Sequence, residues 1–247
     1  MRTHSKNEKE SQLIQKLFFS LFILFLLFSC GEQKPDFYPE LTFTSTPKEG
    51  ILPYFKGETM DPFWKEDGKN LPSDLKQIPE FSLRSHEDKE FNLTHLQNKY
   101  TLVTFFYAKC NGICPLITRS MLNFLPNIDN QTDVQVVSIS VNPEVDTIEE
   151  LKKFRGLYKI TRDNWTFLTG SKDVIYDIAR KQFSADVKII KGQNSLNDFV
   201  HTENVYLLDK DHYLRGIYRA KGSGDLERLL IELKTLKEED LSKNRKG

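Results

Sequence analysis

One stretch of the sequence, residues 105–121 (FFYAKCNGICPLITRSM), restricts the possible folds of this chain more than any other. An apolar, aromatic run that is typical of a buried strand ends at Cys110, and Cys114 follows with Pro115 directly behind it. Proline fits the first turn of a helix, and it disfavours helical backbone in the residue before it. We therefore expect Cys114 to be the N-cap of a helix that begins at about Pro115, with Cys110 in the preceding loop.

Strand and helix patterns alternate from residue 79 onward. Strands are predicted at residues 101–107, 134–140 and 165–168, with hairpins formed by 81–83 and 90–93 and by 204–209 and 213–219. Helices are predicted at residues 115–125, at 171–181 with Ser171 as the cap, and at the end of the chain. The closing helix has an apolar stripe made of Leu226, Leu229, Leu230, Leu233 and Leu236. This order predicts an α/β fold with a central mixed sheet and helices on both faces.

A further helix is predicted to end near residue 157. Asp146 and Glu149 form an acidic version of a capping box before it, so we expect the Asp146 side chain to cap the helix. Its predicted apolar face consists of Ile148, Leu151, Phe154 and Leu157.

The N-terminus has the composition of a signal peptide. Four basic residues precede an apolar run of 12 residues, 17–28, which is shorter than the roughly 20 residues that span a bilayer. The run ends in LFSC, which resembles the lipobox of bacterial lipoproteins, although Phe28 departs from the small residue usual there. The resemblance implies that Cys30 is lipidated and becomes the first residue of the mature chain. The alternative is an uncleaved N-terminal anchor. Either way, we expect a protein of the bacterial cell envelope, anchored to the membrane and facing the periplasm or the exterior.

We divide the chain into a signal peptide at 1–29, a tether and N-terminal extension at 30–78, a folded domain at 79–238 and a charged tail at 239–247, which we expect to fray. The aromatic residues in LPYFKGETMDPFW, residues 52–64, are expected to pack on the folded domain. With 35 basic and 35 acidic residues the formal charge is zero, so nothing in the composition indicates a nucleic-acid partner.

With Cys30 assigned to lipid, Cys110 and Cys114 have only each other or a metal as partners in an oxidising compartment. The start of a helix stabilises a thiolate, so at least one of the two is expected to be more acidic than an ordinary thiol. A purely structural disulfide is the third possibility, but closing so short a loop stabilises a fold only slightly. Two reactive interpretations remain open, a redox pair and a metal site.

The histidines bear on this choice. His4 lies in the leader, and His86, His95 and His212 lie in polar turns or a short polar helix, so we expect the last three to be solvated. His201 differs because it directly precedes a predicted buried strand, in a loop that should meet the cysteine loop at one edge of the sheet. Two thiolates and one imidazole form a soft donor set that suits copper(I), and this set could also hold zinc.

At this point the chain resembles the Sco/SenC family of copper-binding proteins, which have a thioredoxin-like fold. The resemblance is carried by CNGICP at 110–115, DFVHTENVYLLD at 198–209, SISVNPEVDT at 138–147 and WTFLTG at 165–170, and it extends from residue 52 to the final helix. Thioredoxin-like oxidoreductases generally have a cis-proline facing their cysteines. This chain has no proline after Pro143, and His201 stands about where that proline would be.

The resemblance implies a thioredoxin-like fold for 79–238 with an N-terminal hairpin extension. It also implies that Cys110, Cys114 and His201 bind copper, as Cu(I), Cu(II) or both, in a metallochaperone that assembles the copper centre of cytochrome c oxidase. The implied partner is the copper-bearing oxidase subunit or another cuproprotein. One departure from the family pattern is Asn142, where the family usually has aspartate. One alternative is a thiol–disulfide reductase that prepares cuproprotein cysteines, with Cys110 and Cys114 as its redox disulfide. Another is a copper or redox sensor that signals through a changed surface.

Overall fold

The computed structural model describes residues 48–65, 69–128, 132–185, 188–189, 199–200, 203–221 and 223–246. The chain divides into two compact units, and all of these residues lie in the second, Phe43–Gly247. The leader, Cys30 and His201 lie outside the described residues, so the expectations for them remain predictions.

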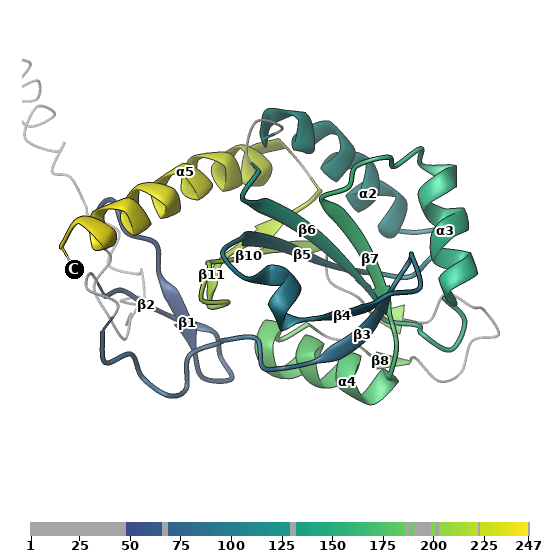
Figure 1. Ribbon diagram of the computed structural model, residues 1–247, viewed down its shortest axis with the longest axis horizontal. Coiled ribbons are helices and arrows are strands. Elements are labelled where there is room, and N and C mark those ends of the chain that lie inside the picture. Colours follow the sequence, from purple (N-terminus) through teal and green to yellow (C-terminus); the bar gives the residue numbers. More distant parts are fainter. Residues whose placement is uncertain are drawn as a thin grey trace, which may run out of the picture. The chain divides into compact units, whose positions relative to one another are not determined.

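In the described part of the chain, the central sheet has seven strands in the order β11-β10-β5-β6-β7-β3-β4 (Figure 1). The central three are β5 (Tyr100–Phe106), β6 (Val134–Ser140) and β7 (Trp165–Thr169), which pair in parallel. The antiparallel strands on the two sides are β3 (Ser82–Ser85), β4 (Glu90–Asn92), β10 (Asn204–Leu208) and β11 (Leu214–Arg219). Both predicted hairpins and the predicted mixed sheet are therefore confirmed.

The helices cover both faces of this sheet. Figure 1 shows α2 (Cys114–Phe124), α3 (Ile148–Leu157) and α5 (Ser223–Lys246) on one side and α4 (Lys172–Asp177) on the other. Right-handed crossovers explain this arrangement, because the chain moves in one direction across the sheet through β5, β6 and β7 and then returns to β10. A π-helical turn, Ile178–Gln182, prolongs α4. Ser171 is the N-cap residue of α4, as predicted, but its side chain makes no capping hydrogen bond.

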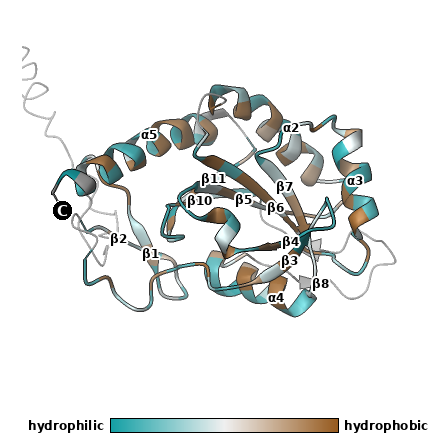
Figure 2. Cartoon of the chain, viewed as in Figure 1, coloured by the Kyte–Doolittle hydropathy of each residue, from teal (hydrophilic) through white to brown (hydrophobic). Residues whose placement is uncertain are grey.

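Buried parallel strands form the centre of the core. Every residue of β5 and β6 is buried, as expected for strands that are covered on both faces. Figure 2 shows hydrophobic colour along β6 and β7, whereas the helices carry both colours. The core-facing stripe of α5 is as predicted, since Leu229, Leu233 and Leu236 are fully buried. On α3, Leu151 and Phe154 are buried but Leu157 is 75% exposed, so the predicted apolar face is one residue too long.

The extension before the sheet packs on the domain through a buried arginine. It contains the hairpin β1 (Tyr54–Lys56) and β2 (Asp61–Phe63). Arg215 of β11 is 0% exposed, donates hydrogen bonds to the carbonyls of Leu52 (2.7 Å) and Pro53 (3.0 Å), and lies 3.9 Å from the centre of the Tyr54 ring. The expectation that the aromatic residues of segment 52–64 pack on the folded domain is confirmed for Tyr54.

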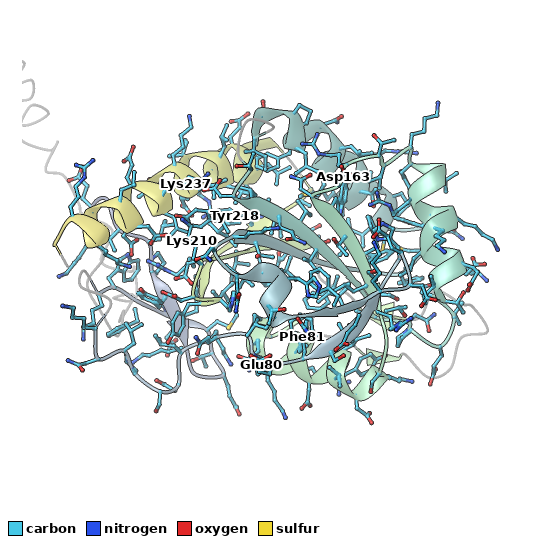
Figure 3. All side chains as sticks on the ribbon, in the orientation of Figure 1. Glu80, Phe81, Asp163, Lys210, Tyr218 and Lys237 are labelled. Carbon is cyan, nitrogen blue, oxygen red and sulfur yellow. The ribbon has the colours of Figure 1, made fainter. Side chains whose placement is uncertain are left out.

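The helix α5 is held against β11 by polar contacts as well as leucines. Tyr218, labelled in Figure 3, is fully buried, and its hydroxyl donates to the carboxylate of Glu232 at 2.6 Å. Gly216 makes room for this ring, because a Cβ there would lie 2.1 Å from the Tyr218 hydroxyl. The helix extends to Lys246, beyond residue 238, after which we expected a charged tail to fray.

Two further strands of two residues each, β8 (Lys188–Ile189) and β9 (Phe199–Val200), pair with each other. The strand β9 ends directly before His201 in the sequence.

Candidate metal and redox site

The two cysteines lie at the carboxyl end of β5, where the chain turns into α2. Cys110 is 6% exposed and Cys114 is 0% exposed. The carboxyl ends of parallel strands are where α/β sheets bind their ligands. The structure therefore brings the two thiols together at the predicted edge of the sheet.

The helix begins one residue earlier than the sequence predicted. Ile113, not Cys114, is the N-cap residue, and Cys114 is already helical with Pro115 in the first turn. The carbonyl of Ile113 accepts hydrogen bonds from the N–H groups of Leu116 (2.9 Å) and Ile117 (3.0 Å). The steric restriction on a residue before proline is a preference, and here these bonds outweigh it.

Cys110 and Cys114 are both thiols and form no disulfide. The hydrogen bond with Cys110, followed by burial, raises the pKa of the Cys114 thiol, and a bond with the backbone of Tyr107 lowers it only in part. Cys114 is therefore not the more acidic thiol that we expected at least one of the two to be, and the prediction now applies to Cys110 alone.

The Cys110 sulfur also lies in a fixed position within its loop. Its Sγ atom accepts a hydrogen bond from the N–H of Gly112 at 3.3 Å, and its own N–H donates to the carbonyl of Tyr107 at 3.2 Å. The two sulfurs thus form a compact, hydrogen-bonded pair, in which the thiol of Cys114 loses its proton less readily than an ordinary thiol.

Asp146, which the sequence assigned to a helix cap, is turned into the protein instead. It is 0% exposed, and its Oδ2 atom accepts hydrogen bonds from the N–H of Ala108 (2.9 Å) and the hydroxyl of Ser140 (2.5 Å). The N-cap of α3 is Thr147, whose Oγ1 accepts from the N–H of Glu150 at 3.4 Å. The predicted acidic capping box is therefore wrong, because the threonine next to the aspartate takes its place.

Burial raises the pKa of the Asp146 carboxyl, and the hydrogen bonds from Ser140 and Ala108 oppose this effect. The Oδ1 atom of Asp146 is buried and has no hydrogen-bond partner among the described residues.

Asn142 belongs to the same group of contacts. It is 7% exposed, its N–H donates to the Ser140 hydroxyl at 3.1 Å, and its carbonyl accepts from the N–H of Asp146 at 2.9 Å. The position where the sequence departs from the family pattern therefore lies in the loop that contacts the cysteine segment through Asp146.

The other histidines correct two expectations. His86 is half-buried: its Nδ1 accepts from the N–H of Phe167 at 3.3 Å, and burial, with a smaller effect of Arg155, lowers its pKa to about 4. His212 is only 9% exposed. Neither is the solvated residue that a polar turn suggested. His95 is exposed, as expected, and its Nδ1 accepts from the N–H of Asn92 at 3.2 Å.

Within the described residues, no group of three or more His, Cys, Asp or Glu side chains is arranged to hold a metal ion. The predicted third ligand, His201, lies outside those residues. None of the helices described is long and apolar enough to cross a membrane.

Many solved structures are similar to this chain, including the following three. A SCO1/SenC family lipoprotein from Bacillus anthracis is 25% identical with a TM-score of 0.60, and the match covers 65% of this chain and 94% of that protein. BsSco, described as having a disulfide switch and as a member of the Sco family of cytochrome c oxidase assembly proteins, is 28% identical with a TM-score of 0.56, covering 65% and 92%. ScoI of Bradyrhizobium japonicum, solved with copper bound, is 23% identical with a TM-score of 0.54, covering 63% and 96%.

These matches confirm the predicted thioredoxin-like arrangement of sheet and helices. The SCO1/SenC family model matches residues 70–237, which include both cysteines, Asp146 and His201. The match covers well over half of the sequence, and the chain therefore belongs to the SCO1/SenC family.

Proposed function

We propose that this protein is a copper metallochaperone that holds copper through Cys110, Cys114 and His201. It delivers the metal to a cuproprotein, either the copper-bearing subunit of cytochrome c oxidase or another acceptor. Membership of the SCO1/SenC family supports this role. So do two solved relatives, of which one is described as a cytochrome c oxidase assembly protein and the other was solved with copper bound.

The observation that carries the proposal is the pair of buried, hydrogen-bonded thiols at the carboxyl end of β5. Thiolates are soft ligands that favour copper(I). Because the raised pKa of Cys114 keeps that thiol protonated, copper binding as a thiolate would release the proton of Cys114. The imidazole of His201 would complete a three-coordinate set.

The same sulfurs can instead form a disulfide, and the two states exclude each other because one pair of sulfurs cannot do both. BsSco is described as having a disulfide switch, which favours a redox function as the second candidate. In that case the protein reduces the disulfide of a partner and prepares its cysteines for copper.

We further propose that the mature protein is a lipoprotein of the bacterial cell envelope, anchored through Cys30. The LFSC sequence supports this, and so does the lipoprotein description of the relative from Bacillus anthracis.

The experiment that tests the copper site is a titration of reduced protein with copper(I) against a competing chelator. We expect Cys110→Ser and Cys114→Ser to abolish tight binding. We expect His201→Ala to weaken binding by roughly tenfold or more, equivalent to about 1.4 kcal/mol, and to leave the fold intact. His95→Ala is the matched control, because it removes an exposed imidazole elsewhere in the chain. Unchanged affinity and stoichiometry in His201→Ala would show that the third ligand is assigned wrongly.

A further inference from the structure

The carboxylate of Asp146 connects the loops that follow two neighbouring strands. Ala108, which donates its N–H to Oδ2, lies two positions before Cys110 in the loop after β5. Ser140, which donates its hydroxyl to the same oxygen, is the last residue of β6. One oxygen atom therefore ties the cysteine loop to the end of the adjacent strand.

This connection lies in the interior of the protein. Asp146 and Ser140 are both 0% exposed. Hydrogen bonds to a charged acceptor that is shielded from water are stronger than ordinary ones. The loop also has internal bonds, from Cys110 N–H to the Tyr107 carbonyl and from Gly112 N–H to the Cys110 sulfur, but these do not link it to β6.

The loop has to move when the cysteines change their redox state. A disulfide requires the two sulfur atoms to be about 2.05 Å apart, whereas hydrogen-bonded thiols remain well beyond that distance. Cys114 is part of the helix α2 and is fully buried. Disulfide formation is therefore expected to move the Cys110 side of the pair, which is the side that Asp146 ties down.

We propose that Asp146 is a positioning residue that holds the cysteine loop in its dithiol conformation and thereby sets the reduction potential of the Cys110–Cys114 pair. The inference rests on the proposed function only in taking the two cysteines as the reactive site.

Oxidation removes two electrons and two protons from the two thiols and forms one S–S bond. With glutathione disulfide as oxidant, two molecules of reduced glutathione are released and the reaction balances. Since Asp146 stabilises the dithiol, its loss favours the disulfide.

The test is the equilibrium of the metal-free protein with reduced and oxidised glutathione. In Asp146→Asn, the amide keeps the shape of the side chain but loses the charge that strengthens both bonds. We expect the equilibrium to shift toward the disulfide by about tenfold, which corresponds to about 30 mV for a two-electron couple. Ser140→Ala removes one of the two bonds and should shift the equilibrium in the same direction.

Ser138→Ala is the matched control. Ser138 lies two residues before Ser140 on the same strand and is 2% exposed. Its hydroxyl accepts a hydrogen bond from the indole N–H of Trp165 at 2.9 Å and shares another with the hydroxyl of Thr104 at 2.8 Å. This variant loses buried hydrogen bonds that do not involve the cysteine loop, so it should lower the thermal midpoint and leave the glutathione equilibrium unchanged. Asp146→Glu restores the charge on a longer side chain and should recover part of the wild-type equilibrium.

The proposal is overturned if Asp146→Asn and Ser140→Ala shift the equilibrium no more than Ser138→Ala does. It is also overturned if they shift it toward the dithiol. Because this measurement contains no metal, its outcome does not depend on copper binding. If the wild-type protein fails to bind copper while Asp146→Asn still shifts the equilibrium, the proposed function fails and the positioning role stands.

Discussion

At the residue scale, burial shifts the pKa values of titratable groups in the loops and turns next to the strands of the sheet. A hydrogen bond with Cys110, followed by burial, raises the pKa of the Cys114 thiol, and burial raises the pKa of the Asp146 carboxyl. The imidazole of His86 has a lowered pKa for the same reason. Burial therefore disfavours the charged form of each of these groups relative to the same group in water.

His86 makes the stability of the fold depend on pH. Its folded-state pKa of about 4 lies below the unfolded value of 6.5, so the unfolded chain binds the proton more tightly. The stability that the neutral ring provides is present above pH 6.5 and is lost as the pH falls toward about 4. We expect His86→Gln to flatten the dependence of the urea midpoint on pH across this window, because glutamine does not titrate.

The control for this prediction is His95→Gln, which changes an exposed histidine and should keep the wild-type slope. An identical slope in His86→Gln and the wild-type protein would contradict the account of His86.

The sequence predicted part of the candidate site at this scale. A CxxxC segment between a buried strand and a proline is enough to place Cys110 and Cys114 at a strand–helix junction, and the structure has them there. The role of Asp146 could not be predicted, because an aspartate before a helix looks the same in sequence whether it caps the helix or turns inward. The available signal was Ser140, a polar residue at the end of a strand that is otherwise suited to burial.

At the scale of elements, the N-terminal hairpin, β11 and α5 are joined through Arg215. Its guanidinium lies 3.0 Å from Asp209 and 2.9 Å from Glu239, and Glu239 also accepts a bond from the N–H of Leu52 at 3.3 Å. The last part of α5 is thus fixed by a buried cluster of charged groups, and the hairpin extension is fixed with it.

Removal of one member of this cluster should be strongly destabilising. Glu239→Ala leaves the buried guanidinium of Arg215 with one carboxylate fewer, and we expect it to lower the free energy of unfolding by about 3 kcal/mol. Glu238→Ala, at the exposed neighbouring position, should change it by less than about 0.5 kcal/mol. Equal urea midpoints for the two variants would contradict the role of the cluster.

The elements themselves were largely predictable, because apolar periodicity follows the buried faces. Residues 134–140 were predicted as a strand and are the strand β6, and the leucine stripe of the final helix is buried. The burial of Glu239 was not predictable, since a carboxylate in a charged segment is usually solvated and its partner, Arg215, lies on a different element. The exposure of Leu157 was likewise not predictable from the helical pattern, because the pattern does not show that Leu157 is the last residue of α3.

At the scale of the whole molecule, the proposed function needs the site to be held at the membrane where oxidase assembly takes place. We expect Cys30→Ala to block lipidation and leave an unprocessed precursor, because the variant lacks the sulfur atom that would carry the proposed lipid. Cys114→Ser should be processed and membrane-bound like the wild type. Gel mobility and fractionation measure both, and a mature-length, membrane-bound Cys30→Ala product would contradict the lipoprotein proposal.

The central claim is that the site passes copper rather than electrons, and one comparison tests it most directly. In the first assay, copper-loaded wild-type and His201→Ala proteins are mixed with a metal-free copper-binding domain of an oxidase subunit, and copper transfer is measured. In the second assay, the same two proteins, reduced and free of copper, are mixed with the disulfide form of that oxidase domain, and disulfide reduction is measured. A reductase acts through a mixed disulfide and needs no metal. We predict copper transfer by the wild type, its loss in His201→Ala, and little metal-free disulfide reduction by either protein. Fast metal-free reduction that survives His201→Ala, without copper transfer by the wild type, would contradict the account and identify the protein as a thiol–disulfide reductase.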